Sequence, residues 1–324
     1  LRGITTKPAG MSPCRQPAAL GNEPDSGDIA AMASRLVEKE VGSIRLQGFS
    51  LAGEETVIVA PELGVAFDVG RAPREIISID HVCLSHGHMD HSAGLAYYFS
   101  QRNFQGMPPG CVLAHHKLVP AIQDLLAVWG RIEGHVSPGQ IVGVDEDEDF
   151  EVRRGLVVRP FRVRHPGPTL GFSLIEVRKK LKPEYADYSG PQIVALKKAG
   201  ETIEYRLEIP RVAYCGDTRL GDFLDHDHVR NAEVLLFECT FFEADHLDRA
   251  RQGQHMHVTD LPALMERVRC PHVVICHITR RTLMREAKQM LAKLLKPEDL
   301  ARITVLMDRP RDRRRVPNSQ EPSS

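Results

Sequence analysis

The stretch Ser85-His86-Gly87-His88-Met89-Asp90-His91 carries three histidines and one aspartate within seven residues, directly after the apolar run 82–84. Burying that many ionisable groups without partners costs on the order of several kcal/mol each. Divalent metal ions offset this cost, because imidazole nitrogens and carboxylate oxygens are ligands that zinc prefers. The stretch therefore predicts metal-assisted chemistry.

A second set of polar residues is expected to complete this metal site. The segment is too short for all of its side chains to reach one ion without strain, so we expect two ions. His86 and His88 would bind one ion, and Asp90 with His91 the other. Further ligands must come from polar residues at predicted strand ends, and the candidates are His165, with His135 as an alternative, Asp217 and His277. Asp217 is the natural bridge, since one carboxylate can span two ions about 3.5–4 Å apart.

Composition limits the class of protein. The chain has 324 residues, of which 42% are apolar, enough for one large α/β domain or two smaller ones. It contains no stretch of 18 or more apolar residues, so we expect no membrane span. The net charge is −1, and any nucleic-acid contact must therefore come from local basic patches. Seven cysteines without a C-x-x-C pair indicate reduced thiols in a cytoplasmic protein.

The chain divides into three parts by composition. We expect a leader or disordered tail at 1–42, an ordered domain at 43–307 and a disordered basic tail at 308–324. Strands are predicted at 55–59, 64–70, 80–85, 111–114, 140–144, 156–164, 169–177, 212–215, 234–237 and 272–276, and helices at 93–102, 119–129, 259–269 and 282–295. Strands that first form meanders and then alternate with helices indicate sheets with helices on the outside.

The motif Ser-His-x-His-x-Asp-His-x-x-Gly at Ser85–Gly94 resembles the first motif of the metallo-β-lactamase superfamily. The likeness implies an α/β fold, the αββα sandwich of two mixed sheets with helices on the outer faces, with a dinuclear site at one edge. Further segments resemble the plant-type short form of the tRNase Z (ribonuclease Z) family. They are 48–71, Tyr214–Thr218, Leu235–Phe241, and His255–His257 with Cys276–Arg281.

The resemblance implies roles for individual residues. One zinc is bound by His86, His88 and His165, the other by Asp90, His91 and His277, and Asp217 bridges them. Mn²⁺ and Fe²⁺ are alternatives to the two Zn²⁺ ions. Glu238 and His257 correspond to the family's catalytic pair that binds no metal, in which His257 protonates the leaving oxygen. Asp90 also orients the attacking water or accepts its proton, and the alternative interpretation of His257 is a helix-start histidine before Thr259.

A lysine-rich insertion at 178–210 lies where this family carries its tRNA-gripping arm. It holds seven Lys or Arg against five acids. Lysines near a phosphate backbone contribute salt-dependent affinity, and the RNA-binding candidates are Arg178, Lys179, Lys180, Lys182, Lys197 and Lys198. The alternative is a solvated amphipathic hairpin. The family's arm serves the partner subunit, which implies a homodimer. We expect the acidic run Asp145–Asp149 to be a solvated turn.

These observations lead to one hypothesis about function. The chain would be a dinuclear zinc phosphodiesterase, a tRNA 3′-processing endonuclease that cuts precursor tRNA after the discriminator nucleotide. The main alternative is a small-molecule metallo-hydrolase of the same fold, either a cyclic phosphodiesterase or a glyoxalase-II-like thioesterase. A non-catalytic RNA-binding relative and an oxygen-reducing di-iron protein are further alternatives. Histidine in place of glutamate at position 88 disfavours the di-iron protein.

Overall fold

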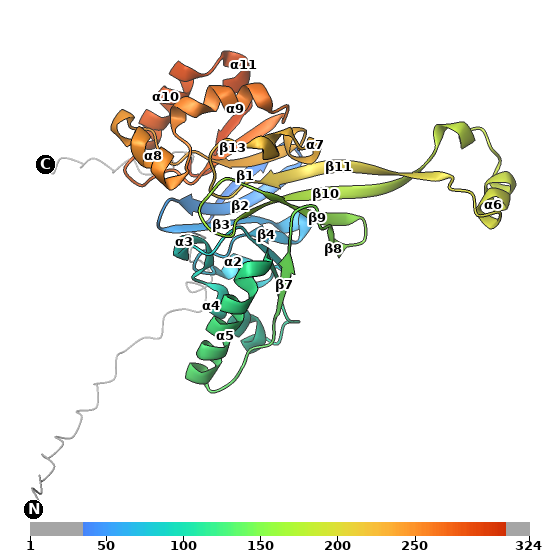
Figure 1. Ribbon diagram of the computed structural model, residues 1–324, viewed down its shortest axis with the longest axis horizontal. Helices are drawn as coiled ribbons and strands as arrows, with labels where there is room; N and C mark the ends of the chain where they lie inside the picture. The colour runs from blue at the N-terminus through green and yellow to red at the C-terminus, as the bar shows by residue number, and fades with distance from the viewer. Residues whose placement is uncertain (1–34, 309–324) are drawn as a thin grey trace, which may run out of the picture. The chain divides into compact units, whose positions relative to one another are not determined.

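Two seven-stranded sheets form the centre of the fold (Figure 1). The structure is a computed structural model and describes residues 35–308. The first sheet contains β1 (Val37–Val41), β2 (Ile44–Leu51), β3 (Glu55–Ala60), β4 (Val65–Phe67), β5 (His81–Leu84), β6 (Cys111–His115) and β7 (Gln140–Val144). The second contains β8 (Phe150–Arg153), β9 (Leu156–Arg162), β10 (Leu170–Leu181), β11 (Glu204–Tyr214), β12 (Val234–Glu238), β13 (His272–Cys276) and β14 (Ile303–Val305).

The two sheets have the same topology. In the first, strands β1 to β4 are antiparallel neighbours and strands β4 to β7 run parallel. In the second, β8 to β11 are antiparallel and β11 to β14 are parallel. Parallel strands bring their carboxyl ends to one edge of a sheet, which is where α/β folds place their chemistry. The polar residues that follow β4, β5, β11, β12 and β13 therefore share one edge.

Helices cover the outer face of each sheet (Figure 1). Beside the first sheet lie α2 (Arg74–Ile77), α3 (Met89–Ser92), α4 (Leu95–Phe104) and α5 (Val119–Glu133). Beside the second lie α7 (Asp227–Arg230), α8 (Leu247–Gly253), α9 (Leu261–Arg267), α10 (Met284–Leu294) and α11 (Pro297–Leu300). The predicted sandwich of two mixed sheets with helices outside is confirmed.

Three apolar layers hold this arrangement together. Side chains such as Phe67, Phe172 and Leu236 fill the space between the sheets. Val82 and Phe99 belong to a second layer, between the first sheet and its helices. A third layer lies between the second sheet and its helices. Strand β3 faces apolar surroundings on both sides, so all six of its residues are buried and its sequence does not alternate.

The insertion at 178–210 forms the outer half of a long hairpin (Figure 1). Strands β10 and β11 pair from Phe172↔Tyr214 to Leu181↔Glu204, and burial ends after Ile175. The tip carries η3 (Pro183–Tyr185) and α6 (Gly190–Lys198). Ile203 is buried there at 2% exposure. We call this protruding hairpin, residues 178–210, the arm.

The structure corrects the predicted start of the domain. Residues 37–41 form β1, which pairs with β2 in antiparallel register, although their composition placed them in the predicted leader at 1–42. Val37 and Val41 are buried, but the charged run between them hides this edge strand from a pattern search. The remaining predicted leader, 1–34, and the tail residues 309–324 lie outside the described residues.

Candidate metal centre

The metal-ligand candidates converge at the shared edge of the two sheets. His86 and His88 follow β5, while Asp90 and His91 lie in the short helix α3. The later elements supply three more side chains from the ends of β9, β11 and β13: His165, Asp217 and His277. All seven predicted ligands are therefore brought together, whereas His135 lies elsewhere, at the end of α5 near Glu133.

These side chains sort into two groups of ligand atoms. His86, His88, His165 and Asp217 form one group, and their ligand atoms lie within 4.8 Å of one another. Asp90, His91 and His277 form the second. An Asp217 oxygen reaches both groups, since its Oδ2 lies 3.7 Å from His86 Nε2 and 3.4 Å from the Nε2 atoms of His91 and His277.

The spacing of these atoms fits a divalent ion. A tetrahedral ion with bonds of about 2.0–2.1 Å separates its ligand atoms by about 3.3 Å. In the second group, His91 Nε2 and His277 Nε2 are 3.4 Å apart. His277 Nε2 and Asp90 Oδ2 are also separated by 3.4 Å. In the first group, His165 Nε2 and His88 Nδ1 are 3.4 Å apart.

Unsatisfied atoms in the site support the same interpretation. His86 Nε2, His165 Nδ1 and Asp217 Oδ1 are buried and have no hydrogen-bond partner among the described residues. Such atoms are costly without a partner, because they have lost water and gained nothing in exchange. A bound cation would satisfy His86 and Asp217. The donor set of five histidines and two aspartates therefore fits divalent metal binding.

Protonation states favour ligation. Burial lowers the pKa of His165 to about 4, and burial together with His91 lowers that of His86 to about 2. Both imidazoles are therefore neutral at pH 7 and keep a lone pair for a cation. Burial acts to raise the pKa of the Asp217 carboxyl, but His277 and His91 hold it well below its ordinary value.

A buried carboxylate within the segment 48–71, not among the site residues predicted from the sequence, orients the first ligands. Asp68 follows β4 in the left-handed region, with φ of 55°, and is fully buried. It contacts His91 Nδ1 at 2.7 Å and accepts from Ser85 N at 2.7 Å and from Tyr214 Oη at 2.5 Å. A carboxylate on the outer nitrogen of a ligating histidine fixes its tautomer and raises its basicity.

His277 is positioned in a similar way. It follows β13 with a left-handed φ of 59°, and its backbone N–H donates to Ser50 Oγ at 2.9 Å. Its Nδ1 lies 2.9 Å from Thr240 Oγ1, and that hydroxyl donates to Glu238 Oε2 at 2.6 Å. The hydroxyl proton is therefore used on Glu238, so Nδ1 of His277 is the donor and Nε2 remains free to bind a cation.

The structure corrects the pairing of Glu238 with His257. Glu238 Oε1 is 2.7 Å from Nδ1 of His255, two residues earlier. His257 instead caps η6 (Val258–Asp260): its Nδ1 bonds with Thr259, and its Nε2 donates to the Glu243 carbonyl. The alternative interpretation, a helix-start histidine, therefore describes His257. Thr259 and Asp260 follow His257 in a pattern typical of a helix cap, and this was the signal in the sequence that His257 serves as a cap. It leaves His255 as the histidine available to Glu238.

The Glu238–His255 pair lies directly beside the metal-ligand groups. The His255 ring centroid is 4.9 Å from that of His165 and 5.6 Å from that of His277. Burial acts to lower the pKa of His255, but the Glu238 carboxylate raises it to about 9. The Glu238 carboxylate therefore favours the protonated form of His255.

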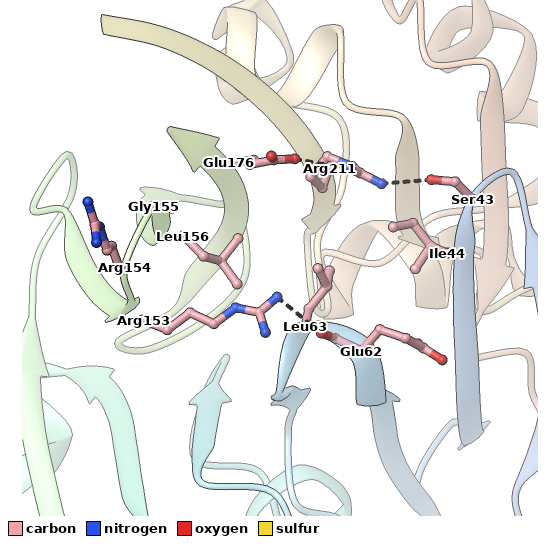
Figure 2. Close-up of a pocket in the computed structure, with 10 residues that line it drawn as sticks. All are labelled: Ser43, Ile44, Glu62, Leu63, Arg153, Arg154, Gly155, Leu156, Glu176 and Arg211. Atoms are coloured by element: carbon pink, nitrogen blue, oxygen red, sulfur yellow. Dashed lines mark hydrogen bonds and ion pairs between the residues drawn. The ribbon is translucent and has the colours of Figure 1, made fainter. Parts of the chain in front are cut away.

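Two cavities differ in their relation to this centre. A cavity of about 400 Å³ adjoins His165 and is lined by His115, His116, Lys117 and Arg162. A second, of about 380 Å³, lies among the turns before β2, β4 and β9, at the other ends of the strands (Figure 2). There Arg211 donates to Ser43 Oγ at 2.7 Å and to Glu176 at 3.0 Å, so this cation is already neutralised.

The comparisons with known proteins agree with the fold. Residues 60–278 match the family model described as "Beta-lactamase superfamily domain". The chain is 30% identical to tRNase Z TRZ1 of Arabidopsis thaliana over 78% of this chain and 91% of that protein. It is also 30% identical to the chloroplastic tRNase Z TRZ2 of the same plant, over 79% of this chain and 73% of that protein.

A solved structure shows the same fold. The crystal structure of human tRNase Z, short form, superposes with a TM-score of 0.52 at 16% identity, covering 73% of this chain and 93% of that one. The αββα sandwich with histidine and aspartate ligands at one edge defines a metallo-β-lactamase-fold protein. Within that superfamily, the chain belongs to the tRNase Z family.

We expect the Asp68→Asn substitution to weaken metal binding by about 10–100-fold, the usual effect of losing such a supporting carboxylate. Asparagine has the same side-chain shape as aspartate and tolerates the left-handed backbone. Its amide nitrogen, however, cannot accept the hydrogen bond that His91 Nδ1 donates to Asp68. Zinc affinity measured by chelator competition checks this. Asp124→Asn, at an exposed position on α5, is the control, and equal affinities of both variants and the parent protein would refute the role of Asp68.

Proposed function

We propose that this chain is a metal-dependent endoribonuclease that removes the 3′ trailer from precursor tRNA. The observation that carries the proposal is the Glu238–His255 pair beside the ligand groups, with Nδ1 held at 2.7 Å from the carboxylate. Cleavage of a phosphodiester needs a proton for the leaving oxygen, and this pair supplies one. The names of the Arabidopsis relatives and the basic arm support tRNA as the substrate.

The metal ligands divide the work of the site. We assign His86, His88 and His165 to one Zn²⁺ and Asp90, His91 and His277 to a second, with Asp217 between them and Mn²⁺ or Fe²⁺ as alternatives. When bound, such ions neutralise the phosphate and make water nucleophilic at neutral pH. Asp90 is the ligand most open to solvent among the carboxylates, at 13% side-chain exposure, and it is placed to accept a proton from the attacking water.

His255 and its neighbours act on the leaving group. The protonated imidazole gives its Nε2 proton to the 3′ oxygen of the tRNA as the bond to phosphorus breaks, which leaves a 3′-hydroxyl on the tRNA. Glu238 holds His255 in this orientation through Nδ1 and stabilises its charge. We assign Lys117, which lines the cavity beside His165 and forms no ion pair within the described residues, to contact with a flanking RNA phosphate.

The arm supplies a surface for the body of the tRNA. The two lysines Lys179 and Lys180, on β10, are exposed and form no ion pair within the described residues, and the same holds for Lys198 at the end of α6. By contrast, Arg178 is paired with Glu176 and Lys197 with Glu204, while Lys182 lies 3.9 Å from Glu184. The three unpaired lysines are the strongest candidates for phosphate contacts, since their charge is not used inside the protein.

A homodimer would let this arm serve a second subunit. Helix α5 exposes an apolar stripe at i, i+3, i+4 and i+7: Leu125, Val128, Trp129 and Ile132, with exposures of 42%, 42%, 43% and 67%. Such a stripe on one helix face is typical of an interaction surface. We assign it to contact between copies of this chain.

Six buried free cysteines among the described residues support a reducing, cytoplasmic compartment. Among the helices that the structure describes, none has the length and apolar character of a membrane span.

The decisive test of the proposed function uses labelled precursor tRNA that carries a 3′ trailer. We expect cleavage at the discriminator nucleotide, loss of cleavage when a chelator removes the ions, and recovery when zinc is restored. Parallel assays with bis(p-nitrophenyl) phosphate and a glutathione thioester test the small-molecule alternative. Intact precursor tRNA together with chelator-sensitive hydrolysis of either small ester would reject the nuclease and retain the metal site.

A separate prediction concerns His255. The His255→Ala substitution should reduce kcat about 10²–10⁴-fold, the usual contribution of a general acid, without loss of bound metal. The acid works only when protonated, so with a pKa of about 9 the rate should be constant near neutral pH and fall as the pH rises through about 9. Glu238→Gln removes the charge that raises this pKa, so the alkaline fall should move to lower pH.

The control for this experiment is His257→Asn, which keeps a capping group for η6. We expect it to retain most of the cleavage activity and an unchanged pH profile. If His257→Asn instead abolishes cleavage while His255→Ala does not, the sequence-based pairing of Glu238 with His257 is correct and His255 is not the general acid.

Complementation between two variants tests the arm and the dimer together. A chain with Lys179, Lys180 and Lys198 changed to Ala should bind precursor tRNA weakly, with a smaller salt dependence of binding. When it is mixed and refolded with the His255→Ala chain, heterodimers combine an intact site with an intact arm from the other subunit. We expect the mixture to cleave faster than the two variants assayed separately and added together. A rate equal to that sum would show that each arm serves the site of its own subunit. A variant with three exposed cations outside the arm, Arg285, Lys293 and Lys296, changed to Ala is the matched control for the lost charge.

A further inference from the structure

A second group of potential metal ligands lies away from the centre described above. Asp147 is in the turn between β7 and β8, His226 lies between η4 (Asp222–Asp225) and α7, and His228 is in α7. One ligand atom from each of these residues lies within 4.8 Å of the other two. None of the three belongs to the proposed catalytic machinery, and the turn that carries Asp147 was expected to be merely solvated.

The key member of this group is His228, whose side chain has an unsatisfied buried atom. The residue is 7% exposed, and its Nε2 is buried with no hydrogen-bond partner among the described residues. Its Nδ1 lies 2.9 Å from Ser173 Oγ, and that hydroxyl is 3.4 Å from the carbonyl oxygen of His228 itself. The hydroxyl proton points to the carbonyl, so Nδ1 is the donor to Ser173 and carries the ring proton.

This arrangement leaves a lone pair on His228 Nε2. A histidine that donates its other ring N–H to an oxygen, with the free nitrogen directed at a cation, is the usual state of a metal ligand in proteins. The neighbouring His226 ring stacks on His228 with centroids 5.3 Å apart and an interplanar angle of 27°. The two imidazoles therefore face the same space, and Asp147 brings a carboxylate to it.

The charges around the group favour a cation. Five consecutive acids form the turn 145–149, and three arginines pair with acids of this turn. Arg159 is paired with Asp149 and Glu208, and Arg162 lies within ion-pair distance of Asp145 and Glu146. The carboxylate of Asp147 forms no ion pair with a Lys or Arg among the described residues, and its neighbours in the group are the two imidazoles. Glu146 Oε1 is 4.0 Å from His226 Nε2 and offers a fourth ligand atom near the group.

We propose that Asp147, His226 and His228 hold one divalent transition-metal ion, with zinc as the preferred ion. Two imidazoles and a carboxylate are typical zinc ligands, whereas calcium and magnesium prefer oxygen alone. The ligand atoms must close to about 3.3 Å for tetrahedral binding. The exposed Asp147 and the partly exposed His226 can make that movement while His228 stays fixed.

The bound ion would cross-link two parts of the fold. The turn 145–149 is the passage from the first sheet to the second, and α7 packs on the hairpin strands β10 and β11. In the same turn, Asp149 pairs with Arg206 of β11 at 2.6 Å. The ion would therefore hold this passage against α7 near the base of the arm, and its role would be structural.

Zinc content of the full-length protein tests the proposal. Protein is saturated with zinc, freed of loosely bound metal by gel filtration, and analysed by emission spectrometry. We expect the unaltered chain to retain one more equivalent than either Asp147→Asn or His226→Ala. Asparagine is chosen because Asp147 has a left-handed φ of 62°, which asparagine tolerates. His135→Ala, which removes an exposed histidine outside both groups, is the matched control and should keep the full content.

Two further measurements distinguish loss of the zinc site from misfolding of the variants. They do not depend on whether the proposed function is correct. Zinc should raise the melting temperature of the unaltered protein more than that of either variant, while all four proteins cleave the same substrate equally. Cobalt substitution should show one tetrahedral absorption component fewer in the variants. Equal zinc content in the unaltered protein, Asp147→Asn and His226→Ala would overturn the proposal, whatever the outcome of the RNA assay.

Discussion

The carboxylate of Asp68 is the contact on which the metal-binding edge depends. It is fully buried and accepts hydrogen bonds from the Ser85 backbone and hydroxyl, from Tyr214 and from His91. Tyr214 belongs to the second sheet, whereas Ser85 follows β5 and His91 lies in α3, so one carboxylate joins the two halves of the sandwich and orients a candidate metal ligand. Burial and Asp68 together raise the pKa of Tyr214, which therefore remains a donor at neutral pH.

Hydrogen-bond satisfaction separates the roles of two further buried acids at this edge, Glu238 and Asp217. Glu238 receives bonds from the backbone of Thr218, Thr240 and Met256 as well as from two side chains. Its oxygens are fully used, so it orients its neighbours and does not bind a cation. Asp217 has an oxygen with no partner within the described part of the chain, and that oxygen is available to a metal ion. Two carboxylates at equivalent depth thus have different functions.

Much of the fold and the ligand set could be predicted from the sequence, because both depend on local signals. Apolar runs that end in a polar residue indicated the parallel strands, and the dense histidine motif located the site. The edge strand β1 was missed because charged residues separate its buried valines. His255 was missed because its role depends on which histidine the following helix uses as a cap. Asp68 was missed because its partners come from distant elements.

The two sheets have the same topology, and each supplies some of the side chains of the candidate site. The first sheet carries His86, His88, Asp90 and His91, and the second carries His165, Asp217, Glu238, His255 and His277. Neither half of the chain contains a complete ligand set. A chain in which only one half is folded therefore holds only part of this candidate ligand set. The seven side chains come together only when both sheets have folded against each other, so assembly of the candidate metal centre requires the complete sandwich.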